Sequence, residues 1–92
     1  MLYLIAYDLK TPARDYAALY QTIKSFETWW HYLESTWIVK TARNLDDVVE
    51  LLHKQIDSND RLFVVDISQS KRNGWLPRKA WDWLRRQDDA DE

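Results

Sequence analysis

Three segments of the chain have the hydrophobic pattern of a strand. Residues 2–9 and 61–67 are apolar at both odd and even positions, which predicts two strands buried on both faces. Residues 29–41 alternate like a strand but are long for a single one. We therefore expect a break or tight hairpin near Glu34-Ser35-Thr36.

Two other segments have a helical period. After Thr11-Pro12, a pair that suits a helix start, residues 14–28 carry one apolar stripe: Tyr16, Leu19, Tyr20, Ile23 and Phe26. Asn44 is a predicted N-cap, and a second stripe follows it: Leu45, Val48, Val49, Leu52 and Ile56. From these helices and the flanking strands we expect six nearly fully buried side chains: Ile5, Leu19, Ile23, Val49, Leu52 and Val64.

The remaining segments are turns and a short final helix. Asp57-Ser58-Asn59-Asp60 is a turn cluster, and residues 68–76 form a loop that holds the only glycine. Pro77 suits the first turn of a helix over about residues 77–86. We expect a single domain over residues 1–86, with its core in 1–68 and an appendage in 69–86, followed by a disordered acidic tail at 87–92.

The predicted order is β-α-β-β-α-β with a C-terminal appendage helix. This order indicates an α+β, ferredoxin-like fold with an antiparallel sheet. Two helices cover one face of that sheet, and no element is left for the other face, although its strands are apolar there too. With thirteen aromatic residues in 92, the chain has more aromatic surface than one small core needs. We therefore expect a homodimer that packs through the second face or through the sheet edges.

The composition excludes several chemistries. The chain has no cysteine, which rules out disulfides, thiolate zinc sites and cysteine nucleophiles and fits a reducing, cytoplasmic compartment. The apolar N-terminus meets a charge at Asp8 and is too short to be a signal sequence or to span a membrane, so we expect no membrane partner. There is no glycine-rich phosphate loop and no Ser-His-Asp pattern.

Charge is unevenly distributed although the net charge is only −2. Residues 71–86 hold six cations against Asp82 alone, which gives this segment a net charge of +5: Lys71, Arg72, Arg78, Lys79, Arg85 and Arg86. They are interleaved with Trp75, Trp81 and Trp83, a mixture that suits single-stranded RNA or DNA. The alternative is an amphipathic helix that docks its tryptophans and leaves its arginines in solvent.

The order and motifs of the chain resemble the CRISPR-associated "Cas-two" proteins and their VapD relatives. The resemblance rests on a first strand that ends in Tyr7-Asp8, on the helix after it, and on the run from Tyr32 to Val39. The tryptophan-rich run from Thr28 to Leu33, the segment from Ser35 to Thr41 and the Asp57–Asp60 turn are most similar to the bacterial SinR-like group. The resemblance covers about residues 1–68 and implies a ferredoxin-like dimer.

In the nuclease members of that superfamily, an Asp at the end of the first strand is proposed to bind a divalent metal beside its symmetry mate. Asp8 matches this position, so the resemblance implies a catalytic, metal-binding Asp8 with Mg²⁺ or Mn²⁺. Ser35 matches the serine of the second-strand motif. His31, among Trp29, Trp30 and Tyr32, could act as an acid or base or stack on a nucleobase.

Each of these residues also has a purely structural interpretation. Asp8 could accept backbone N–H bonds from the loop at 9–12, and His31 could be a packed strand residue. Trp29, Trp30 and Trp37 could form a base-stacking platform, or a core or dimer interface.

The sequence therefore leaves two functions open. The first is a nucleic-acid-binding homodimer, with possible metal-dependent ribonuclease or deoxyribonuclease activity through Asp8. The second is a non-catalytic dimeric interaction or scaffold module in defence or toxin–antitoxin biology. On the question of catalysis, the acidic net charge and a first helix whose only basic residues are Arg14 and Lys24 favour the second. The resemblance favours the first as the ancestry of the chain.

Overall fold

The computed structural model describes residues 1–11 and 14–90, with only the backbone of residues 89 and 90. Pro12, which was expected to open the first helix, lies outside the described residues. Four strands and three helices follow one another along the described part of the chain. In order they are β1 (Leu2–Asp8), α1 (Ala17–Lys24), β2 (Thr28–Leu33), β3 (Thr36–Lys40), α2 (Leu45–His53), β4 (Arg61–Asp66) and α3 (Arg78–Ala90).

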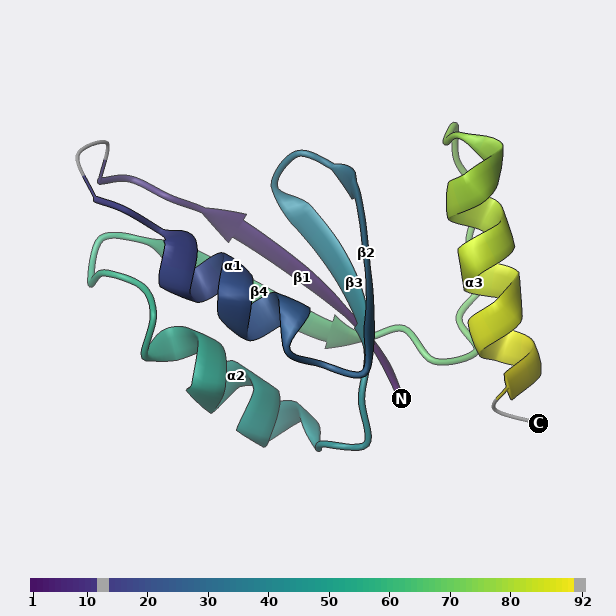
Figure 1. Cartoon of the computed structure of the whole chain (residues 1–92), viewed down its shortest axis with the longest axis horizontal. Coiled ribbons are helices and arrows are strands. Elements are labelled where there is room, and N and C mark those ends of the chain that lie inside the picture. The colour runs from purple at the N-terminus through teal and green to yellow at the C-terminus, as the bar shows by residue number, and fades with distance from the viewer. Residues whose placement is uncertain (12–13, 91–92) are drawn as a thin grey trace.

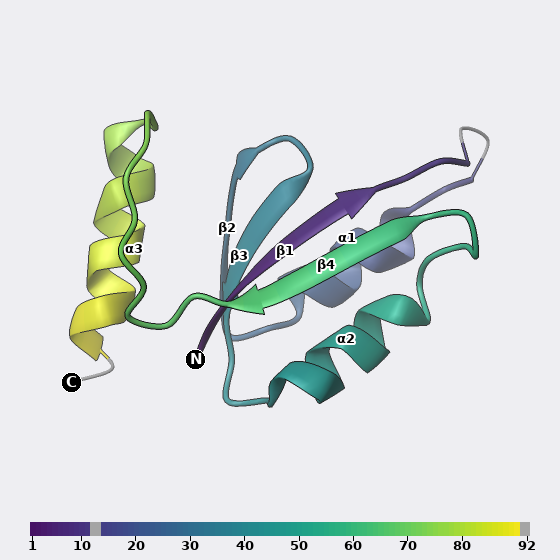
Figure 2. The same cartoon turned by 180° about the vertical axis from the view of Figure 1, so that it is seen from behind.

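The strands form one antiparallel sheet in the order β2-β3-β1-β4. Ile5 of the central strand β1 lies between Trp37 of β3 and Val64 of β4. Helices α1 and α2 lie along one side of the sheet, and α3 stands away from them, beyond β2 (Figures 1 and 2). The predicted α+β class and antiparallel sheet are confirmed, and the strand order is compatible with a ferredoxin-like fold.

The predicted hairpin within residues 29–41 is confirmed. β2 ends at Leu33 and β3 begins at Thr36, and these two residues pair across the turn formed by Glu34 and Ser35. The register shifts between Trp30 and Leu33. Such an irregularity changes which side chains reach each face of the sheet.

The main core lies between the sheet and helices α1 and α2. Four of the six side chains that were expected to be buried have no exposed surface: Ile5, Leu19, Ile23 and Leu52. The prediction for Val49 is wrong, because this side chain is 37% exposed while Val48 is fully buried in its place. Val48 and Leu52 are four residues apart on α2, so they share the face that points to the core. Val64, on the edge strand β4, is half-buried rather than buried.

Helix α3 covers part of the second sheet face. It forms a second core with strand residues, whose buried members are Leu2, Trp30, Ile38, Ala80, Trp83 and Leu84. The indole of Trp30 donates a hydrogen bond of 3.2 Å to the Ala80 carbonyl, and the indole of Trp83 donates one of 3.2 Å to the Thr28 hydroxyl. The expectation that no element was left for this face is therefore wrong, because the final helix packs its tryptophan stripe there.

The rest of the second face is open. Phe63 of edge strand β4 is 65% exposed, and Tyr32 and Leu33 at the end of β2 are 42% and 46% exposed. Phe63 lies opposite Ala6 of β1 in the ladder, which places both on the same face of the sheet. We call this exposed surface the open end of the second face. It is smaller than the whole uncovered face expected from the sequence.

Helix α3 is longer than predicted. It continues to Ala90, so residues 87–90, which were expected to begin a disordered tail, are helical. The Gln87 side chain donates a hydrogen bond of 3.2 Å to the Trp83 carbonyl within the helix, and the ion pair of Asp88 with Arg72 ties this last turn to the preceding loop. Residues 91–92 lie outside the described residues. Among the residues that are described, no helix is long and apolar enough to cross a membrane.

Candidate functional site

Asp8 ends β1 at the open end of the second face. Its side chain is 63% exposed, and its carboxylate lies 2.9 Å from the Lys10 ammonium group. Arg61 of β4 is its partner in the ladder. The carboxylate is therefore accessible to solvent and has cationic residues beside it, which reduces its repulsion of an approaching phosphate.

One structural interpretation of Asp8 was that it accepts backbone N–H groups of the following loop. In the structure, Asp60 accepts such groups instead. The Lys10 backbone N–H donates to Asp60 over 2.7 Å, and the Asp57 N–H donates to the same carboxylate over 2.7 Å. The Tyr16 hydroxyl donates to it as well, over 2.8 Å. Burial alone would raise the pKa of Asp60, but these hydrogen bonds outweigh it and hold that pKa below its ordinary value.

Asp60 is thus a structural carboxylate that ties the start of α1 to the turn before β4. The sequence placed it in a turn but gave no reason to single it out from the other acidic residues there. Its tertiary contacts with Lys10 and Tyr16, 50 and 44 positions away, distinguish it.

Ser35 and His31 both lie in the β2–β3 hairpin. Ser35 is exposed in the turn, and its carbonyl accepts the Tyr7 N–H over 3.2 Å, which brings the turn next to the carboxyl end of β1. The exposed imidazole of His31 stacks on Trp37, with ring centroids 3.6 Å apart and ring planes 14° apart. Because Trp37 belongs to the main core, His31 points to the helical side of the sheet, the side opposite to Asp8.

Asp8 has no cluster of further ligating side chains around it among the described residues. In the part of the chain that is described, no group of three or more His, Cys, Asp or Glu side chains could hold a metal ion. A hard cation such as Mg²⁺ takes oxygen ligands, and water or substrate phosphate can supply several of them. The resemblance implies that a second carboxylate comes from Asp8 of another copy.

The six cations of the predicted nucleic-acid segment have different surroundings. Arg72 is built into the fold: it donates to the Ile67 carbonyl over 2.9 Å and pairs with Asp88 over 3.4 Å. Arg85 pairs with Asp82 on the surface of α3. The other four are exposed to solvent: Lys71, Arg78, Lys79 and Arg86.

Five of the six tryptophans divide into two groups, and Trp81 is half-buried against the second core. Trp30, Trp37 and Trp83 are buried, so the core interpretation is confirmed for them. Trp29 is 41% exposed beneath Lys24, whose ammonium group lies 5.4 Å from the ring centre. Trp75, in the loop before α3, is fully exposed. It has the accessibility that a stacking side chain needs.

The structure does not bring Asp8 and the basic segment together within one chain. β1 points away from α3, and its carboxyl end lies on the opposite side of the molecule in both views (Figures 1 and 2). The chain is 40 Å across in its longest dimension. Binding at α3 and chemistry at Asp8 would therefore involve separate surfaces of the monomer.

Comparisons with known proteins give no match: no protein-family model, no curated protein and no solved structure matches the chain. The fold and the surfaces described above define a small α+β domain with one basic, tryptophan-bearing helix and one open sheet end. The resemblance to the CRISPR-associated and VapD proteins continues to rest on the sequence motifs alone.

Proposed function

We propose that this chain is a nucleic-acid-binding protein with a ferredoxin-like fold that acts as a homodimer. The observation that carries the proposal is the fully exposed Trp75, which precedes the first cation of α3, Arg78, by three residues in the chain. An exposed aromatic ring and a set of exposed cations on the following helix supply the two interactions that bind single-stranded nucleic acid, base stacking and phosphate attraction.

Helix α3 has an inner face that packs against the sheet and an outer face that is basic. Ala80, Trp83 and Leu84 are buried against the sheet. The residues with a helical period on the opposite side are exposed and cationic: Arg78, Lys79, Arg85 and Arg86. Asp82 is the one acidic residue between them, and it pairs with Arg85. A polyanion that meets this face would therefore encounter mostly positive charge.

Two of these cations lie where they do not stabilise α3. Arg78 and Lys79 lie in the first turn of α3, and no acidic residue lies there. A helix N-terminus carries a partial positive charge, so a cation there costs about 0.3–1 kcal/mol at an exposed site. Departures from local stability rules of this kind occur most often at functional sites.

The proposal can be tested by fluorescence anisotropy with labelled RNA and DNA single strands of about 20 nucleotides and with the matching duplexes. We expect single strands to bind more tightly than duplexes and affinity to fall steeply between about 50 and 200 mM salt. Trp75→Ala should weaken binding about 5-fold to 150-fold, the equivalent of one stacked base. Replacing Arg78 and Arg86 with Ala should flatten the salt slope by about two units.

Matched controls separate a specific site from general charge. Arg43 and Lys54 are exposed cations at the two ends of α2, so replacing both with Ala removes the same charge elsewhere. Trp29→Ala removes another exposed indole. If these controls weaken binding as much as the α3 and Trp75 variants do, or if no nucleic acid binds at low salt, the proposal fails.

A second candidate function is a metal-dependent nuclease built from two copies. Its supporting observation is that Asp8 is exposed on the sheet face that also carries the exposed Phe63. A second copy that packs on Phe63 could bring the two Asp8 carboxylates together, where Mg²⁺ or Mn²⁺ would relieve their repulsion. Bound there, the ion would activate a water for phosphodiester cleavage.

Sedimentation and a metal-titrated cleavage assay test this candidate. Phe63→Glu should turn a dimer into a monomer, and it should not unfold the chain because the side chain is already 65% exposed. Asp8→Asn should abolish both cleavage and any rise in melting temperature with Mg²⁺ or Mn²⁺. If the wild type is a dimer that binds nucleic acid but does not cleave it, the nuclease is excluded and the binding function stands. A dimer with neither property would be the non-catalytic interaction module.

A further inference from the structure

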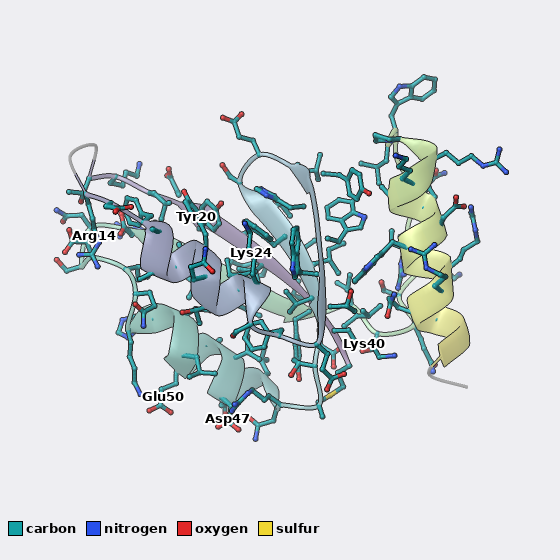
Figure 3. The ribbon with its side chains drawn as sticks, in the orientation of Figure 1. Arg14, Tyr20, Lys24, Lys40, Asp47 and Glu50 are labelled. Atoms are coloured by element: carbon teal, nitrogen blue, oxygen red, sulfur yellow. The ribbon has the colours of Figure 1, made fainter. Side chains whose placement is uncertain are left out.

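The helical side of the sheet has a hollow of about 340 Å³ that none of the functions above uses. It lies where α1 faces the β2–β3 hairpin, and Tyr20 and Lys24 project from α1 on that side (Figure 3). Three aromatic rings, an imidazole, a carboxylate and an ammonium group surround it: Tyr7, Trp37, Tyr20, His31, Glu34 and Lys24. An aromatic-lined hollow with a few converging polar groups is typical of a small-ligand site.

A stack of nearly parallel rings forms one wall of the hollow. His31 lies on Trp37 at 3.6 Å with 14° between the planes, and Tyr20 stacks on the same indole at 6.3 Å with 23°. Trp37 is only 2% exposed, so the rings around it leave little of its surface free. His31 is exposed and is therefore the end of the stack to which another planar ring could be added.

The orientation of His31 is fixed before any ligand arrives. Its Nε2 atom lies 3.0 Å from the Glu34 carbonyl oxygen. A carbonyl can only accept a hydrogen bond, so Nε2 is the donor in this contact. A ring held in place in this way loses little freedom when a ligand stacks on it.

The polar groups of the hollow are suited to a ring with hydrogen-bonding edges and an attached anion. The Trp37 indole donates to the Tyr7 hydroxyl over 3.0 Å. Glu34 can accept from an exocyclic amine, and Lys24 can hold an anionic group. A cationic ligand fits less well because Lys24 would repel it.

We propose that this hollow binds a nucleoside monophosphate, with its base stacked on the exposed face of His31 and its phosphate near Lys24. The volume lies at the small end of the range for ligand sites, about 300–1,000 Å³, which fits one nucleotide rather than a dinucleotide. The site goes beyond the function proposed above, because none of its residues belongs to α3 or to the loop that carries Trp75.

The test is a titration of the full chain with AMP and CMP, followed by the resonances of the tryptophan indole N–H groups. Adenosine alone and inorganic phosphate alone are the two partial probes. We expect saturable shifts with the nucleotides, weaker binding of adenosine, and no shift of the Trp37 resonance with phosphate. His31→Ala should weaken AMP binding about 10-fold or more, whereas His31→Phe should retain it because stacking is kept.

Further variants make the result specific. Lys24→Ala should weaken AMP binding but leave adenosine binding unchanged. His53→Ala and Lys54→Ala, which remove an exposed histidine and lysine near the end of α2, should have no effect. Arg78 and Arg86 replaced together with Ala should also leave AMP binding unchanged, so failure of this site is distinguishable from failure of the α3 surface.

The inference would be overturned by any of four outcomes. The first is the absence of saturable shifts up to about 10 mM nucleotide, where a ligand with a dissociation constant of about 1 mM is mostly bound. The second is an equal effect of the His31 and His53 variants. The third is loss of AMP binding in the α3 variant, and the fourth is tighter binding of tetramethylammonium than of AMP.

Discussion

Truncation of Leu52 gives the sharpest test of the fold, which positions both the basic face of α3 and the surface around Asp8. Leu52 lies on α2 with no exposed surface, in the cluster that joins α1 and α2 to β1 and β3. Changing it to Ala removes three carbon atoms from the centre of this cluster. Because α2 also holds the turn that leads into β4, loss of this contact should destabilise the whole domain and not one end of it.

The magnitude follows from the burial. Three carbon atoms at about 0.8 kcal/mol each give about 2.4 kcal/mol for the lost transfer from water. The cavity that remains adds to this value, since surrounding side chains relax only in part, and Leu→Ala changes in cores cost about 2–5 kcal/mol in total. A domain of this size has about 5–14 kcal/mol of stability, so the variant should still fold.

Urea denaturation followed by far-UV circular dichroism measures the effect. At about 1 kcal/mol per molar urea, the midpoint should fall by about 2 M or more. Leu45→Ala is the matched control, because the same truncation is made on the same helix at a side chain that is 37% exposed. A loss below about 0.5 kcal/mol for Leu52→Ala, or equal losses at both positions, would mean that α2 presents another face to the sheet.

The other predictions concern the helix phase and the acid stability. Val48→Ala should lower the free energy of unfolding by about 1–2 kcal/mol, while Val49→Ala should change it by less than about 0.5 kcal/mol. The reverse order in urea denaturation would mean that Val49 is the buried valine, as the sequence predicted. The pKa of Asp60 is held below its ordinary value of 3.8, so the folded state takes up this proton at lower pH than the unfolded state does. Its contribution is fully present above that ordinary value and is lost as pH falls below it. Asp60→Asn should therefore flatten the acid side of a curve of unfolding free energy against pH. Glu27→Gln, at an exposed carboxylate, should not. Equal acid-side slopes for the wild type and Asp60→Asn would refute this.

The elements themselves could be predicted because each depends on local pattern. The apolar periods fixed the positions of the strands and of α1 and α2, and Asn44 accepts the Asp47 N–H over 2.9 Å as the predicted N-cap. The choice between Val48 and Val49 could not be made in the same way. Two adjacent apolar residues on a helix are 100° apart, and which one is buried depends on how the helix meets the sheet.

The second face shows a different limit of sequence reasoning. The tryptophan stripe of α3 could be recognised in the sequence as an apolar surface. The sheet face that it covers could not, because the local sequence of a helix does not determine which surface it packs against. Trp30, 50 residues before Ala80, became part of that contact through its indole N–H. The small-ligand hollow is a further case, since its side chains come from β1, α1 and the hairpin and no short motif contains them.

The placement of α3 changes what a homodimer could look like. With Trp83 and Leu84 already covering one part of the second face, a second copy that packs on this face would meet the open end around Phe63. A two-fold axis there would put the two Asp8 residues near the centre of the dimer. The two α3 helices would then lie toward its outer ends, because α3 and the carboxyl end of β1 are on opposite sides of each chain (Figure 1). A nucleic acid long enough to touch both basic faces would have to pass the central carboxylates, so one dimer could hold a strand at two points and present the stretch between them to Asp8.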